Sequence, residues 1–140
     1  MPGREKHVVA RVEDVRPGTP LLRDVKGRRI GLFNLGGEFF ALHNRCPHQG
    51  AELCRGRITH LVQAETPTSI TTSRHGEFIK CPWHGWEFDI RTGQSWCDPN
   101  SMYVRQFGVT VEPGEVLVKG PYVAESFPVS VEGNYLVVEM

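Results

Sequence analysis

Apolar and polar residues alternate over short runs along most of the chain, a pattern typical of β-strands rather than helices. No stretch keeps the 3.6-residue apolar period of an amphipathic helix, so we expect little helix. Glycine and proline residues separate the runs and indicate turns between short strands. The pattern predicts strands over 7–12, 21–25, 29–35, 38–42, 78–80, 86–90, 109–111, 116–118, 127–131 and 135–138.

Gly36 and Gly37 stand between two of these apolar runs and predict a hairpin. Glycine reaches the positive φ angles that a tight hairpin turn needs, because it has no Cβ. Many short strands joined by such turns predict an all-β fold class, a small antiparallel sandwich or barrel-like pair of sheets.

Length and charge restrict the classes of function that the chain can have. The chain has 140 residues, which predicts a single domain over 1–140. Its 16 basic and 16 acidic residues cancel, so no overall field favours nucleic acid or an anionic membrane. The apolar runs are too short to span a bilayer, and residues 1–7 lack the apolar stretch of a secretory signal. We therefore expect a cytoplasmic protein whose four cysteines form no disulfide scaffold.

Two short runs carry the candidate chemistry, Cys46-Pro47-His48 and Cys81-Pro82-Trp83-His84. Each offers one thiolate and one imidazole where a strand pattern breaks, and a glycine follows each of them. Two sulfurs and two nitrogens hold either a metal ion or a mixed-ligand iron–sulfur cluster. A structural zinc ion is one alternative, although zinc sites usually group the cysteines in one pair and the histidines in another.

These runs, followed by Gly50 and Gly85, resemble the two sequence boxes of the Rieske [2Fe–2S] family over roughly residues 7–138. The resemblance implies a Rieske-like antiparallel sandwich with a two-loop cluster-binding subdomain, at about residues 43–97. It also implies one [2Fe–2S] cluster per chain, with Cys46 and Cys81 on the inner iron and His48 and His84 on the outer iron. The other two cysteines, Cys54 and Cys97, are interpreted as ordinary packed or solvated residues.

Departures from the respiratory and photosynthetic branches of this family indicate a different role. Ala51 and Trp83 occupy the positions of a disulfide that braces the loops in those branches. Trp86 and Phe88 replace residues whose hydroxyls donate hydrogen bonds to the cluster and its ligands. Since such bonds stabilise the reduced state, we expect a potential near the low end of the Rieske range, roughly −150 to +300 mV.

The resemblance implies an electron carrier rather than a stand-alone catalyst. The remaining histidines, His7, His43, His60 and His75, show no spacing suited to a mononuclear iron site. The expected function is a monomeric Rieske-type ferredoxin that passes electrons from a flavin-dependent reductase to a terminal oxygenase. An accessory subunit of a nitrite-reductase-like complex is the alternative from another class.

The interval between the two boxes, from Gln49 to Lys80, holds 32 residues and is long for this kind of ferredoxin. The excess falls at about 59–78 and is interpreted as an extended loop or hairpin, either a tolerated insertion or a docking element. Four basic residues near the boxes form either a docking patch or a solvated face: Arg45, Arg55, Arg57 and Lys80. Trp83 and Trp86 are expected to shield the cluster from water.

Overall fold

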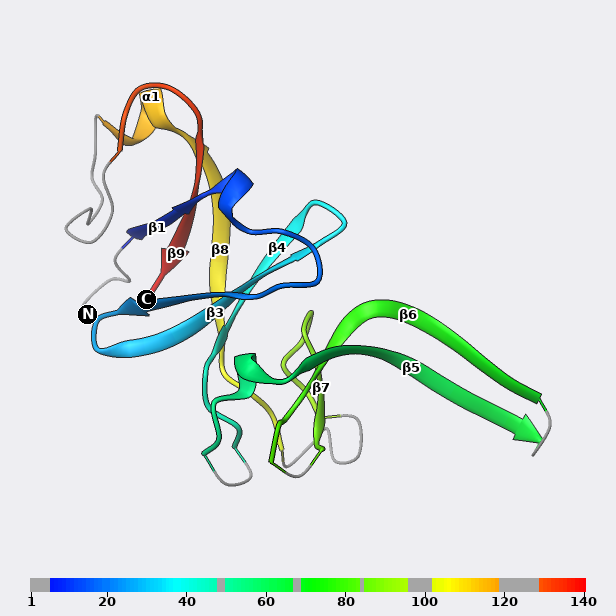
Figure 1. Cartoon of the computed structure of the whole chain (residues 1–140). Helices are drawn as coiled ribbons and strands as arrows, with labels where there is room; N and C mark the ends of the chain where they lie inside the picture. The colour runs from blue at the N-terminus through cyan, green and yellow to red at the C-terminus, as the bar shows by residue number, and fades with distance from the viewer. Residues whose placement is uncertain (1–5, 48–49, 67–68, 84, 96–101, 119–128) are drawn as a thin grey trace. The chain divides into compact units, whose positions relative to one another are not determined.

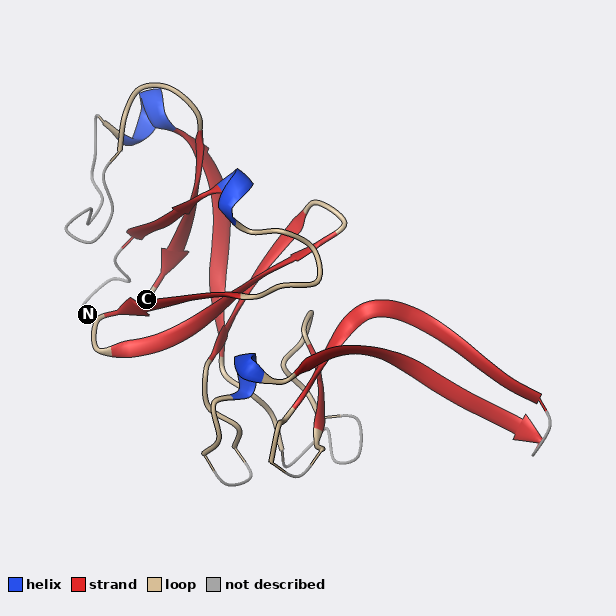
Figure 2. Ribbon diagram, in the orientation of Figure 1, coloured by secondary structure: helices blue, strands red, loops and turns tan. Residues whose placement is uncertain are grey.

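The computed structural model describes residues 6–47, 50–66, 69–83, 85–95, 102–118 and 129–140 (Figure 1). Strands and turns make up nearly all of these residues, with only short helical turns between them (Figure 2). The chain divides into two compact units, one formed by residues 1–43 with 106–140 and the other by residues 44–105. The second unit contains both cysteine boxes.

The first unit is one antiparallel six-stranded sheet with the order β1-β9-β8-β4-β3-β2. A 3-10 turn, Val12–Asp14, follows the first strand, and a four-residue helix, α1, spans Gly114–Leu117. The strands are β1 (Lys6–Arg11), β2 (Leu21–Val25), β3 (Arg28–Leu35), β4 (Glu38–His43), β8 (Gln106–Pro113) and β9 (Asn134–Glu139).

The sheet of the first unit curls until its two edge strands approach each other. The Arg23 Nε atom on β2 donates a hydrogen bond of 3.0 Å to the Val9 carbonyl oxygen on β1. This bond links the two ends of the strand order, which gives the sheet a nearly closed form. The inward side chains are apolar and buried, including Ile30, Leu32 and Leu136, each with no exposed surface. This closed sheet holds β4 and β8, the two strands whose ends continue into the second unit.

The predicted hairpin at Gly36 and Gly37 is confirmed, because β3 and β4 pair across it. The φ angles of the two glycines are 62° and 93°, the left-handed region that a two-residue hairpin turn requires. The side chain of Asn34 fixes this turn, since its Oδ1 atom accepts a 2.9 Å hydrogen bond from the Gly37 amide. The turn sets the register of β4, which ends at His43, directly before the first box.

The second unit contains a 3-10 turn, η2 (Leu53–Arg55), and a three-stranded sheet with the order β5-β6-β7. The strands are β5 (Arg57–Thr66), β6 (Ser69–Lys80) and β7 (Glu87–Asp89). β7 pairs only with residues 78–80 of β6, and the rest of β5 and β6 continues beyond it as a two-stranded ribbon (Figure 1). The interval between the boxes is therefore a hairpin over these residues.

The predicted all-β, antiparallel fold class is confirmed, but two of the predicted strands are not. Residues 116–118 follow β8 as part of α1 and its end, because the partner strand β9 begins at Asn134, which pairs with Pro113. Among the described residues, no strand continues the ladder beyond that pair. Of the strand predicted at 127–131, residues 127 and 128 lie outside the described residues. Residues 129–131 form no strand; the Ser130 amide donates to the Tyr135 hydroxyl at 3.0 Å instead.

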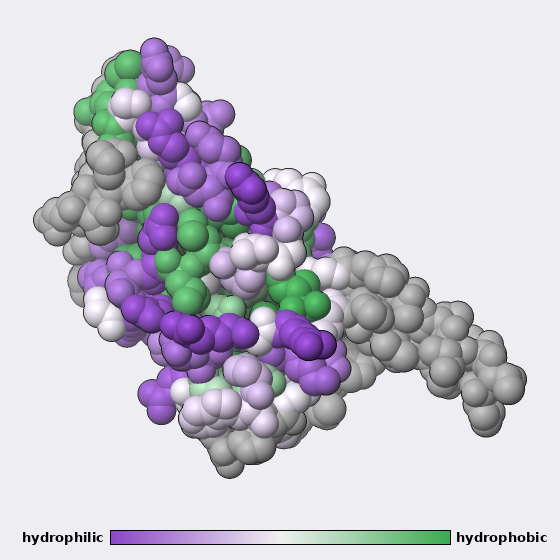
Figure 3. Space-filling model, in the orientation of Figure 1, coloured by the Kyte–Doolittle hydropathy of each residue, from purple (hydrophilic) through white to green (hydrophobic). Residues whose placement is uncertain are grey.

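Two further observations bear on the sequence-based expectations. No helix among the described residues is long and apolar enough to cross a membrane. On the face drawn in Figure 3, hydrophilic residues predominate among those coloured, and apolar residues gather in only a few places. The expectation of one domain over 1–140 stays a prediction.

Because a two-stranded ribbon is only marginally stable in water, we expect the part of the hairpin beyond β7 to contribute little to folding. Replacing residues 61–76 with Asn-Gly should change the melting temperature by less than about 4 °C, measured by circular dichroism. Glu77 is kept, since its Oε1 atom accepts a 2.8 Å hydrogen bond from the Arg91 Nε atom.

The matched control is Phe78→Ala, in the part of β6 that does pair with β7. Phe78 is 1% exposed, so its truncation should lower the free energy of unfolding by about 3–5 kcal/mol. A larger loss of stability from the shortened hairpin than from Phe78→Ala would contradict the prediction.

Candidate metal centre

The two cysteine boxes form loops that are closed by the same pair of backbone hydrogen bonds. In the first loop, the Cys46 amide donates to the Ala51 carbonyl at 2.8 Å, and the Gly50 amide donates to the Cys46 carbonyl at 2.8 Å. In the second, the Cys81 amide donates to the Trp86 carbonyl at 2.7 Å, and the Gly85 amide donates to the Cys81 carbonyl at 3.1 Å. The cysteines therefore begin equivalent loops, although the sequence between cysteine and glycine differs.

The glycine that ends each loop is required by the backbone. Gly50 has φ 79° and Gly85 has φ 73°, a region that side chains with a Cβ rarely occupy. The basic residue before each cysteine also lies against this glycine. A methyl group added at Gly50 would meet the Arg45 Nε atom at 3.4 Å, and one added at Gly85 would meet the Lys80 Cε atom at 3.2 Å. Each loop thus has a basic side chain beside it.

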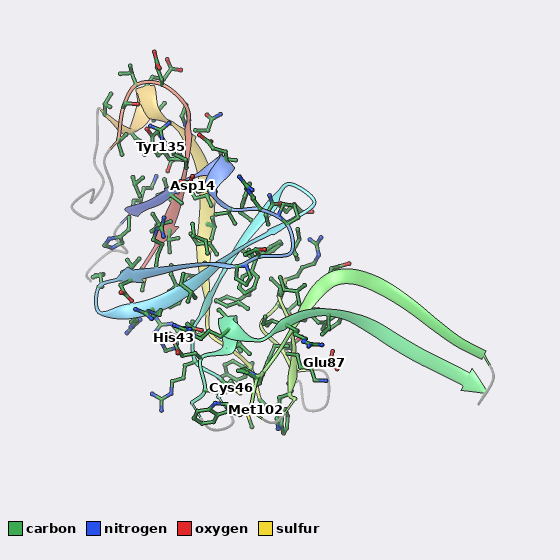
Figure 4. All side chains as sticks on the ribbon, viewed as in Figure 1. Asp14, His43, Cys46, Glu87, Met102 and Tyr135 are labelled. Carbon is green, nitrogen blue, oxygen red and sulfur yellow. The ribbon has the colours of Figure 1, made fainter. Side chains whose placement is uncertain are left out.

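Both predicted sulfur ligands are buried. Cys46 is 1% exposed and Cys81 is 3% exposed, and neither forms a disulfide. Figure 4 shows Cys46 in the loop that follows β4, beyond His43. The two predicted nitrogen ligands, His48 and His84, lie outside the described residues. Among the residues that are described, no three histidine, cysteine or acidic side chains gather at a distance suited to a metal ion.

A buried asparagine joins the first loop to the turn η2. Asn44 is 7% exposed and lies two residues before Cys46. Its Oδ1 atom accepts a 2.8 Å hydrogen bond from the Cys54 amide, and its Nδ2 atom donates to the Glu52 Oε1 atom at 3.4 Å. The amide side chain therefore holds the base of the first loop against the segment that follows it.

The turn η2 in turn touches the second loop through a glycine. Gly56 follows η2, and its amide donates to the Leu53 carbonyl at 2.9 Å. A methyl group added to Gly56 would overlap the carbonyl oxygen of Lys80, the residue before Cys81. Only glycine allows this close backbone approach, so η2 connects the supports of both cysteines.

The third described cysteine has the environment of a packed thiol. Cys54 is 6% exposed. Burial, together with the nearby Glu52 carboxylate, raises the pKa of its thiol to about 12. Since the thiolate is the form that binds metals, Cys54 is poorly suited to be a ligand. This agrees with its interpretation as a packed residue; Cys97 lies outside the described residues.

The aromatic residues near the loops differ from the expectation that both tryptophans shield the site. Trp83 is 61% exposed, so it faces water rather than covering a buried centre. Trp86 is half-buried, whereas Phe88 and Ala51 are buried. His43 ends β4, and its ring packs edge-on against Phe107 with centroids 6.5 Å apart.

Two buried thiols at equivalent positions of matched, hydrogen-bonded loops are suited to a centre that prefers sulfur ligands. Sequence reasoning found these cysteines from their spacing but missed Asn44 and Gly56. A buried asparagine or a required glycine has no local signature, because its role depends on a residue that lies far away in the sequence. For Gly56, that residue is Lys80 on β6.

The contact between Gly56 and Lys80 gives a direct prediction. Gly56→Ala should lower the free energy of unfolding by about 1–3 kcal/mol, since the added methyl group forces the backbone before Cys81 to move. Chemical denaturation followed by tryptophan fluorescence measures this change. The control is Gly108→Ala, where a methyl group meets nothing within 4 Å and should change stability by less than about 0.5 kcal/mol. Equal effects of the two substitutions would contradict the close contact.

Comparison with known proteins places the chain in a family. Residues 5–108 match the model of the Rieske [2Fe-2S] domain. The ferredoxin subunit of 3-phenylpropionate/cinnamic acid dioxygenase from Escherichia coli is 32% identical over 110 residues, which cover 79% of this chain and 89% of that protein.

Solved structures agree with this assignment. The ferredoxin of carbazole 1,9a-dioxygenase from Nocardioides aromaticivorans has a TM-score of 0.62 and 26% identity, covering 95% of this chain and 96% of that one. A putative nitrite reductase small subunit from Mycobacterium tuberculosis has a TM-score of 0.63, covering 98% and 96% of the two chains. Its 18% identity shows a common fold alone. On the family match and the dioxygenase relative, the chain belongs to the Rieske [2Fe–2S] family.

Proposed function

We propose that this chain is the ferredoxin component of a multi-component oxygenase. It would carry electrons one at a time from a flavin-dependent reductase to a terminal oxygenase. The observation that supports this role best is the 32% identity to a dioxygenase ferredoxin subunit over most of both chains. The matched cysteine loops supply a site of the kind such a carrier needs. The expectation of a cytoplasmic monomer stays a prediction.

The cofactor is a Rieske-type [2Fe–2S] cluster, as family membership implies. The two proposed sulfur ligands suit this cluster. Both cysteines are buried, and each begins a loop that is closed by the same pair of backbone hydrogen bonds. In our proposal, Cys46 and Cys81 supply the sulfur ligands, and His48 and His84 supply the nitrogen ligands. When bound, such a cluster takes up and releases a single electron.

The chain's own residues set the surroundings of this site. The hydrogen bonds that close each loop fix the cysteine backbone, so the ligands need little rearrangement between redox states. Phe88 is buried and offers no hydroxyl to a cluster or its ligands, which favours a potential toward the low end of the Rieske range. Arg45 and Lys80 act in the opposite direction, since positive charge beside the loops stabilises the more negative, reduced state.

The ligand set is tested by replacing each cysteine with serine. Cys46→Ser and Cys81→Ser should abolish the visible absorption and the paramagnetic signal of a reduced Rieske cluster, because each removes one sulfur ligand. Cys54→Ser is the matched control, and it should keep both signals, since the Cys54 thiol stays protonated at neutral pH. Absorption spectra, metal analysis and electron paramagnetic resonance measure the outcome. A colourless wild-type protein containing zinc would contradict the cluster.

The carrier role is tested with the reductase and oxygenase encoded nearest to this chain's gene. Adding the purified protein should raise NADH-dependent product formation by that pair at least about tenfold, because neither partner is expected to exchange electrons efficiently alone. The Cys81→Ser variant should give no such increase. Stable copurification with an enzyme, without any acceleration of electron transfer, would instead favour the accessory-subunit alternative.

A further inference from the structure

A cavity of about 400 Å³ lies in the second unit beside Cys81. It is lined by three basic residues, the second cysteine and neighbouring loop residues: Arg55, Gly56, Arg57, Lys80, Cys81, Pro82 and Gly85. No acidic residue is among them, so the cavity presents concentrated positive charge next to a proposed cluster ligand.

The placement of two of these charges is unfavourable without an anion. Arg57 and Lys80 are directly opposite each other in the β5–β6 ladder. Like charges at opposed positions of an antiparallel pair destabilise the sheet. The sheet therefore places two exposed cations side by side, where one anion can contact both.

Nearby acidic side chains form no ion pair with these two cations among the described residues. Glu52 is paired with Arg55, whose Nε atom lies 2.9 Å from the Glu52 Oε2 atom. Glu87 lies opposite Lys80 on β7, but its Oε2 atom accepts a 2.8 Å hydrogen bond from Thr59. Within the part of the chain that the structure describes, neither Arg57 nor Lys80 forms an ion pair.

We propose that this cavity is a docking site for carboxylates on the surface of the electron-transfer partner. This rests on the carrier role proposed above and adds the chemistry of the partner: an acidic segment that enters between Arg57 and Lys80. Opposite charges at such a contact speed the encounter of two proteins and fix their orientation. An acidic segment held there would bring the partner against the loop that begins at Cys81.

An exposed aromatic residue favours a protein over a free anion as the occupant. Trp83 is 61% exposed and follows Pro82, which lines the cavity. Tryptophan and arginine are both enriched at energetically important positions of protein interfaces. A small inorganic anion would use the cations but would leave this apolar surface in water.

The test measures binding of a fluorescently labelled oligoglutamate peptide to the cluster-containing protein by fluorescence anisotropy at low salt. Arg57→Gln with Lys80→Gln should weaken binding by about tenfold or more, because both cations that face the carboxylates are removed. Arg57→Lys with Lys80→Arg should restore most of the affinity. The visible spectrum of each variant confirms that the cluster and its loops are intact.

The matched control removes the same net charge elsewhere. Arg16→Gln with Arg28→Gln changes two exposed basic residues of the first unit and should leave peptide binding unchanged. Equal weakening by both double variants would mean a general charge effect and would overturn the proposal. Displacement of the peptide by an equal concentration of inorganic phosphate would indicate a free-anion site and would also overturn it. Peptide binding does not depend on electron transfer, so this result is separate from the test of the carrier role.

Discussion

The second unit depends on one backbone contact, the approach of Gly56 to the carbonyl of Lys80. Asn44 holds the base of the first loop to the turn η2. Gly56, directly after this turn, packs against the end of β6, the strand that leads to Cys81. The two cysteines, 35 positions apart in the sequence, are thus supported by a single connected set of contacts. Because backbone atoms make the critical contact, its geometry is far stiffer than one made by long side chains.

The same arrangement brings charge to the site. Lys80 takes part in the contact through its carbonyl group, while its side chain lies against Gly85 and lines the cavity with Arg57. One residue therefore serves the packing of the second loop, the electrostatics beside it and the proposed docking surface. A cation beside the proposed ligand Cys81 would also couple partner binding to the ease of reduction, since a bound carboxylate would offset part of its field.

Local features of the chain were predictable from the sequence, and long-range ones were not. The Gly36-Gly37 hairpin and the cysteine boxes depend on neighbouring residues, so their patterns are sufficient. The strand predicted at 116–118 was wrong because its existence depends on where β9 begins. Trp83 is exposed although the sequence predicted a shielding role, since an aromatic residue beside a ligand box has no local pattern that tells which side faces water. The ligand roles of Cys46, Cys81, His48 and His84 remain predictions from the boxes alone.

The ribbon of β5 and β6 beyond β7 has a consequence for handling the protein. There, each strand has one neighbour among the described strands, so one row of backbone N–H and C=O groups on each takes no part in a strand ladder. Unpaired edges of this kind accept a strand from another chain and promote aggregation. At high concentration, self-association is therefore expected to begin at this ribbon, on the same unit as the cysteine loops. The extra length between the boxes thus makes the protein more prone to aggregate at high concentration.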